Sequence, residues 1–136
     1  MGYVHAEITL KNPRLPARQL AAVTAMVDTG ALMLCLPQRL VDELSLEEST
    51  RRKVVTADGS AHMVPYVGPV EVIFEDRRCF VGALVLGDEV LLGAMPMEDM
   101  DLIVSPTHRK LVANPASPDF PHALVKANRE KSPCLP

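Results

Sequence analysis

The stretch Ala25-Met26-Val27-Asp28-Thr29-Gly30-Ala31 places an acidic side chain directly after two apolar residues and directly before a turn. It ends the apolar run Leu20–Val27 and is followed by a second apolar run, Leu32–Pro37. An isolated carboxylate is costly to bury in apolar surroundings, so a protein keeps one there only if it is paired, hydrogen-bonded or protonated. Asp-Thr-Gly is also an ordinary turn sequence, in which Asp caps backbone N–H groups and Gly supplies a positive φ.

The composition limits the classes of protein to consider. A chain of 136 residues predicts one domain with a single modest core, and its 48% hydrophobic and 23% charged content is ordinary for a soluble globular protein. The formal charge of -3, with Lys and Arg only in short groups, argues against a nucleic-acid partner. No apolar run approaches the roughly 20 residues of a membrane span, and the N-terminal residues lack the pattern of a secretion signal. We therefore expect a cytoplasmic protein with neither a membrane nor a nucleic-acid partner.

No cofactor or metal site is predicted. Cys35, Cys79 and Cys134 are odd in number, widely spaced and outside any C-x-x-C arrangement, which favours reduced structural thiols. The four histidines are isolated from one another and from cysteine. The sequence has no H-E-x-x-H, no Gly-rich phosphate loop and no G-x-S-x-G. It therefore lacks the motifs expected of a metalloprotease, a nucleotide-binding protein or an α/β-hydrolase.

Strand patterns dominate the chain. Residues 3–10 alternate as a half-buried strand does, and the run 20–27 is consistent with a strand buried on both faces that ends at Asp28. Further strands are predicted at residues 32–37, 53–57, 60–67, 69–75, 79–87, 101–104 and 109–115, with turns at Asp58-Gly59 and Asp76-Arg77, a short helix at Pro37–Leu44 and one or two helical turns at 94–100. This spacing predicts a closed or sandwiched all-β domain. Residues 115–136 contain five prolines and predict a flexible tail.

A second signal follows Asp28-Thr29-Gly30-Ala31 in the sequence. About sixty residues later comes the apolar segment Val90-Leu91-Leu92-Gly93-Ala94, and a hairpin pattern lies between the two. This arrangement resembles the retropepsin-like aspartic proteases, in which Asp-Thr/Ser-Gly-Ala/Ser is followed by a flap hairpin and then by an apolar-apolar-Gly segment that opens the C-terminal helix. The resemblance extends from about Ala21 to Val104. It implies a closed acid-protease β-barrel over residues 1–114, with one or two short helices and a flap hairpin, before the tail at 115–136.

The resemblance also implies a reaction and a partner. Peptide hydrolysis by water needs a base and an acid, and two carboxylates about 3 Å apart, which cannot both ionise, share one proton and supply both; aspartic proteases are the known example of this pair. The chain has no second Asp-Thr/Ser-Gly, so the second carboxylate must come from a second copy. We therefore expect a symmetric homodimer that acts on peptides or unfolded proteins without a metal or organic cofactor.

The family pattern assigns roles to individual residues. Asp28 would be the catalytic carboxylate, the Thr29 hydroxyl would cross-link the two active-site loops, and Gly30 would let the backbone approach the substrate. The predicted substrate-binding residues are Ala31 and the flap tip, Ala57, Asp58, Gly59 and Ser60. Leu92 and Gly93 would pack beneath the loop and fix it. The candidate interface strands are residues 3–10, 101–104 and 109–115.

Two other functions stay open from the sequence alone. The first is a catalytically silent dimer of the same fold that binds peptides or a protein partner, with Asp28 retained for loop structure. The second is an unrelated small β-domain with an Asp turn. The complete Asp28-Thr29-Gly30-Ala31 signature favours an active peptidase, because a silent descendant is free to lose it.

Overall fold

The computed structural model describes residues 3–17 and 20–126, so Cys134 lies outside the described residues. In order along the chain, the elements are β1 (Val4–Lys11), β2 (Ala21–Val27), β3 (Leu34–Leu36), α1 (Gln38–Glu43), β4 (Glu48–Val55), β5 (Ala61–Phe74), β6 (Arg77–Val85), β7 (Val90–Leu92), α2 (Ala94–Asp99), β8 (Leu102–Ser105) and β9 (Lys110–Ala113). No helix in this part of the chain has the length and apolar character to cross a membrane.

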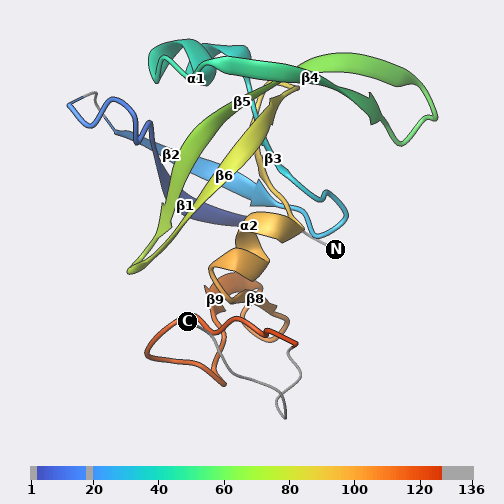
Figure 1. The fold of residues 1–136 in the computed structure, drawn as a ribbon. Coiled ribbons are helices and arrows are strands. Elements are labelled where there is room, and N and C mark those ends of the chain that lie inside the picture. Colours follow the sequence, from blue (N-terminus) through green and yellow to red (C-terminus); the bar gives the residue numbers. More distant parts are fainter. Residues whose placement is uncertain (1–2, 18–19, 127–136) are drawn as a thin grey trace.

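The first seven strands in this order form one sheet that closes on itself. The strands are hydrogen-bonded in the order β1-β2-β7-β3-β6-β5-β4, and β1 also pairs with β5. Six strands therefore close into a barrel, while β4, within the described parts of the chain, pairs only with β5 and extends with it beyond the barrel (Figure 1). The predicted all-β class, closed barrel and short helices are confirmed.

The strand β1 alternates as predicted, with Ala6, Ile8 and Leu10 buried. The prediction that β2 is buried on both faces is wrong. Ala21 and Ala25 are buried, whereas Ala22 and Thr24 are exposed, so one face of β2 is in contact with solvent. A run of small apolar residues does not specify burial, because an exposed alanine costs little.

The strand β5 is longer than the sequence indicates. It runs continuously over Ala61–Phe74, where two strands at 60–67 and 69–75 were predicted. Pro69 does not end it, because the register between β5 and β6 shifts between Val67 and Val70 and leaves the proline outside the ladder. Its partner β4 begins at Glu48, earlier than the predicted Lys53, because a strand beyond the barrel tolerates charged side chains.

One main core fills the barrel. Its fully buried side chains include Leu10, Leu34, Leu36, Leu44, Leu92 and Met100, which come from strands and from both helix regions. The predicted helix after Pro37 is confirmed, and α1 contributes Leu40 and Val41 to this core. Cys79 is buried and free, and burial raises the pKa of its thiol to about 12, so it remains protonated and unreactive.

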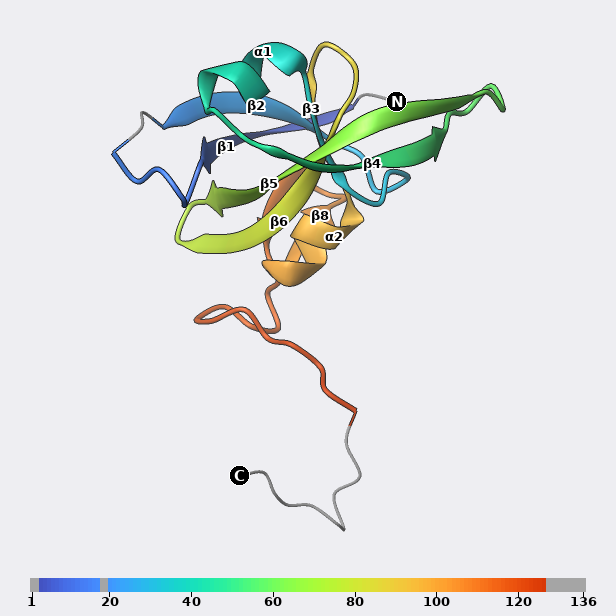
Figure 2. The same cartoon turned by 45° about the horizontal axis from the view of Figure 1, so that its top comes forward.

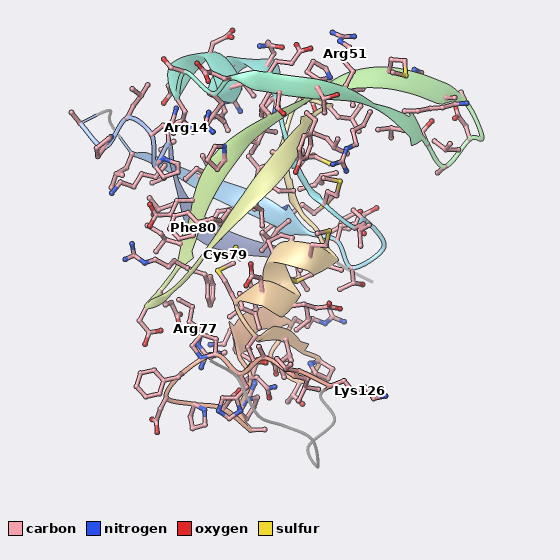
Figure 3. All side chains as sticks on the ribbon, viewed as in Figure 1. Arg14, Arg51, Arg77, Cys79, Phe80 and Lys126 are labelled. Carbon is pink, nitrogen blue, oxygen red and sulfur yellow. The ribbon has the colours of Figure 1, made fainter. Side chains whose placement is uncertain are left out.

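The start of the predicted tail is attached to the domain. Residues 115–126 form no helix or strand, but Ser117 is only 2% exposed. The buried Arg77 donates hydrogen bonds to the carbonyls of Met100 at 3.2 Å and Asp101 at 2.9 Å, and to the carbonyl of Ser117. Figure 3 shows Arg77 beside this segment at the end of the barrel. The flexibility predicted for 115–136 therefore does not describe Ser117, while the domain boundary at 114 stays a prediction.

The Asp101 carboxylate completes this attachment. It accepts hydrogen bonds from the Ser117 hydroxyl, from the His122 N–H at 2.9 Å and from Asn114 Nδ2 at 3.0 Å. These hydrogen bonds, with a smaller contribution from Arg77, lower the pKa of Asp101 to about 2.

We predict that Arg77→Met lowers the free energy of unfolding by about 3 kcal/mol, because three backbone carbonyls lose a buried charged donor. Urea denaturation measures this loss, and limited proteolysis should show earlier cleavage after Asn114. The control is Arg14→Met, because the Arg14 side chain is 63% exposed and pairs with an exposed Glu47. It should change stability by less than about 1 kcal/mol. Equal effects of the two variants would contradict the role given to Arg77.

Candidate active site

Asp28 follows the last residue of β2 and is held there by β7. The two strands are parallel with Val27 opposite Leu92, and the Asp28 N–H donates to the Leu92 carbonyl at 3.0 Å. The Asp28 side chain is half-buried, whereas Thr29 and Gly30 are exposed. The apolar strand therefore delivers the carboxylate to the surface of the barrel at a fixed point.

The carboxylate of Asp28 also shapes its own turn. Its Oδ1 accepts a hydrogen bond from the Gly30 N–H at 2.9 Å, and its backbone carbonyl accepts one from the Ala31 N–H at 3.1 Å. Gly30 does not have a positive φ, so the ordinary turn explanation is wrong on that point. A Cβ at Gly30 would instead lie 3.2 Å from Asp28 Oδ1, and glycine here gives the carboxylate room.

Gly93 supports the loop from beneath. The Ala94 N–H donates to the Ala31 carbonyl and the Met95 N–H donates to the Leu32 carbonyl, both at 2.8 Å. A Cβ at Gly93 would lie 2.4 Å from the Met33 carbonyl oxygen and 2.8 Å from that of Ala31. The φ of Gly93 is -89°, which any residue can adopt, so glycine is required here by the close approach of two backbones.

An apolar wall extends from Asp28 toward the hairpin of β4 and β5. This wall is a second cluster, separate from the main core, made of the buried Cys35, Val64 and Leu84 and the partly buried Met33, Val54, Tyr66, Leu86 and Leu91. Burial raises the pKa of the Cys35 thiol, and the negative charge of Asp28 raises it further. The sequence prediction missed this wall, because its members come from five separate strands and the loops beside them. The signal that could have found it is the alternation within each of those strands.

The predicted flap residues form the tip of the β4–β5 hairpin. The Asp58 carboxylate accepts hydrogen bonds from the Ser60 N–H at 3.0 Å and hydroxyl at 2.6 Å, and from the Thr56 hydroxyl at 2.7 Å. These bonds lower the pKa of Asp58 to about 2. Gly59, with φ +87°, provides the turn. The tip is thus fixed by its own side chains.

The two groups of predicted residues lie on one side of the barrel. Backbone contacts join Asp28 to Leu92 and Ala31 to Gly93, and Thr29 and Gly30 lie between these two points of the loop. The hairpin that carries Ala57, Asp58, Gly59 and Ser60 extends outward on the side of the β2–β3 loop in both views (Figures 1 and 2). Within the described residues, no hydrogen bond links the hairpin tip to this loop. No group of three metal-binding side chains occurs in that part of the chain.

A family model described as "Aspartyl protease" matches residues 18–112. The chain belongs to this aspartyl protease family. The match includes the Asp28 loop, the hairpin and the Gly93 segment, so the predicted resemblance to retropepsin-like aspartic proteases is confirmed. Among solved structures, the chain is similar to the solution structure of Simian Foamy Virus (mac) protease, at 18% identity and a TM-score of 0.47, over 68% of this chain and 90% of that one. A comparison with curated proteins found no match.

For this member of the aspartyl protease family, we predict that Gly93→Ala lowers the free energy of unfolding by about 3 kcal/mol, because the new methyl group meets backbone oxygens that cannot move independently. Thermal and urea denaturation measure the loss. The control is Gly30→Ala, where the close contact is the end of a side chain, and we expect a change below about 1 kcal/mol. A Gly93→Ala protein as stable as the Gly30→Ala protein would refute the packing argument.

Proposed function

We propose that this chain is an aspartic endopeptidase that hydrolyses peptide bonds with water activated between the Asp28 carboxylates of two copies. The observation that carries the proposal is the environment of Asp28. Its Oδ1 is oriented by the Gly30 N–H, while Oδ2 has no hydrogen-bond partner among the described residues. A carboxylate that is oriented through one oxygen, while its other oxygen accepts no hydrogen bond from the protein, is available for proton transfer.

The reaction needs one proton shared by the two carboxylates. The ionised Asp28 takes a proton from water as the water oxygen attacks the scissile carbonyl carbon, and the protonated Asp28 gives its proton to the carbonyl oxygen. The resulting tetrahedral diol then returns a proton to one carboxylate, the C–N bond breaks, and the leaving nitrogen accepts a proton from the dyad. Each proton that leaves the dyad is replaced, so the pair is ready for another cycle.

Several features of the single chain support a second copy. The chain contains one Asp-Thr-Gly. The Thr29 side chain is exposed, and its hydroxyl has no hydrogen-bond partner among the described residues, as expected if it bonds across the two-fold axis. Leu32 and Met95, joined by a backbone hydrogen bond next to the loop, are 63% and 48% exposed. A partner that covers this apolar pair would gain free energy from its burial.

The strand pairing shows which edges of the candidate interface strands are free. The barrel pairs β1 with β2 over Val4–Leu10, but with β5 only over Thr9–Lys11, so the second edge of β1 is unpaired over Val4–Ile8 among the described residues. In the same part of the chain, β8 and β9 form a two-stranded sheet outside the barrel and pair only with each other, so each also has an unpaired edge. Unpaired edges accept strands from another chain. We infer that the dimer forms through the free edges of β1 or of the β8–β9 hairpin.

The proposed substrate is a peptide or an unfolded protein in extended form. It would lie between the Asp28 loop and the hairpin, with Ala31 on one side and the tip residues Ala57, Asp58, Gly59 and Ser60 on the other. The apolar wall beside Asp28 would receive side chains next to the scissile bond. Closure of the hairpin over the peptide would separate the scissile bond from bulk water.

We predict that Asp28→Asn abolishes hydrolysis of a casein-type substrate, because an amide can neither accept the water proton nor donate one. The fall in kcat should exceed about a thousandfold, while the melting temperature and the dimer content stay close to those of the wild type. The control is Asp76→Asn, an exposed turn residue at the far end of the β5–β6 hairpin. Full activity in pure Asp28→Asn protein would remove Asp28 from the mechanism.

We predict that each active site needs two copies of Asp28, which mixing tests directly. When wild type and Asp28→Asn exchange subunits at equal concentrations, about a quarter of the dimers contain two Asp28 residues. Activity per total protein should fall to about a quarter of the wild-type value. Sedimentation should show a dimer throughout. A fall only to about half, or an active monomer, would refute the shared site.

A further inference from the structure

Arg52 lies on the face of the β4–β5 hairpin that is turned toward the barrel. In the register of this hairpin Arg52 is opposite Val64, and directly opposed residues share a face. Val64 is only 7% exposed and belongs to the apolar wall beside Asp28, as does Val54, which is two residues along β4 from Arg52. The adjacent Arg51 and Lys53 alternate to the other face, and Figure 3 shows Arg51 pointing away from the barrel.

The Arg52 guanidinium is held in place by two members of the wall. Its carbon atom lies 4.0 Å from the centre of the Tyr66 ring, and its Nη1 lies 3.8 Å from the sulfur of Met33. The Tyr66 ring is itself seated on Gly82, where a Cβ would lie 2.0 Å from the Tyr66 hydroxyl. Met33 follows the Asp28 loop along the chain. The stacking fixes the charge at the rim of the apolar wall, against a side chain that belongs to the segment after the Asp28 loop.

Among the residues that the structure describes, no carboxylate pairs with the charge at Arg52. The ion pairs among the described residues join Arg14 to Glu47, Arg51 to Glu48, Arg77 to Asp101 and Arg78 to Glu71. Arg52 takes part in none of them, and a thioether sulfur is a weak acceptor. When a guanidinium stacks on an aromatic ring, its N–H groups still point outward in the plane of the guanidinium. They can therefore bind a carboxylate with two parallel hydrogen bonds.

We propose that Arg52 determines substrate specificity by binding an acidic side chain of the peptide, beyond the residue whose apolar side chain packs on the wall. This inference rests on the proposed peptidase function and names the substrate class of that site. Because the guanidinium is already oriented by Tyr66 and Met33, little conformational entropy is lost when it binds the carboxylate. In a symmetric dimer the Arg52 subsite occurs twice. The preference for an acidic residue must therefore appear at equal distances on the two sides of the scissile bond.

The test uses a set of peptides with one apolar pair at the centre, in which Glu, Gln or Lys is placed in turn at each flanking position. Wild-type protein should cleave the Glu peptide about tenfold faster in kcat/KM than the Gln peptide at one position on each side. At that position Arg52→Gln should remove the preference, Arg52→Lys should retain part of it, and Arg52→Glu should favour the Lys peptide. The matched control Lys53→Gln removes the neighbouring charge on the other face of β4 and should keep the wild-type profile.

A purely structural role for Arg52 predicts a different result. If Arg52 only braces the hairpin, Arg52→Gln lowers kcat/KM equally for the Glu, Gln and Lys peptides and lowers the melting temperature. That outcome, or an acidic preference that persists in Arg52→Gln, would overturn the proposal.

A binding measurement separates this inference from the proposed function. Fluorescently labelled Glu and Gln peptides are titrated with Asp28→Asn protein, and anisotropy should show about tenfold tighter binding of the Glu peptide. The double variant Asp28→Asn/Arg52→Gln should bind the two peptides equally. If wild-type protein cleaves none of the peptides while this preference is present, the peptidase function fails and the acidic subsite stands. If neither peptide binds, or both bind equally, the subsite is refuted.

Discussion

The direct contact between the backbone of Gly93 and the carbonyl groups of Ala31 and Met33 is the constraint on which the rest of the site depends. It leaves no space for a side chain at position 93, and the hydrogen bonds that follow it align the start of α2 with the Asp28 loop. The parallel pairing of β2 with β7 delivers Asp28 to the same point. The position of the carboxylate is therefore set by backbone contacts, which are stiffer than side-chain contacts.

The residues that stabilise the barrel are different from those that we propose to bind the substrate. The main core, in which Leu36 and Leu92 are fully buried, joins the closed sheet to the helices, and a second cluster around Cys35 includes Val54 and Val64 of the hairpin. The hairpin extends beyond the barrel with charged residues on β4, and its tip is fixed by Asp58 rather than by contact with the loop. Substrate recognition can thus vary along the hairpin, as we infer for Arg52, without a change in the core.

The errors of sequence interpretation have a common cause. The apolar pattern predicts a strand that begins at Lys53, whereas β4 begins at Glu48 and its first residues are polar or charged. The sequence also predicts a break at Gly68, although a register shift accommodates Gly68 and Pro69 within β5. In both cases the deciding factor was the neighbouring strand, which supplies hydrogen bonds whether or not the local sequence favours a strand.

The sequence by itself determined the all-β class, the short helix after Pro37 and the family, because Asp28-Thr29-Gly30-Ala31 and the Gly93 segment are recognised from residue identity and spacing alone. Only the tertiary structure decided why Gly93 must be glycine, and which residues form the apolar wall. It also decided that Arg52 lies against Tyr66 and Met33 while its neighbours Arg51 and Lys53 do not. The physical reason is that the register between strands far apart in the sequence decides which backbones come close and which face each side chain lies on. Local composition does not encode that register.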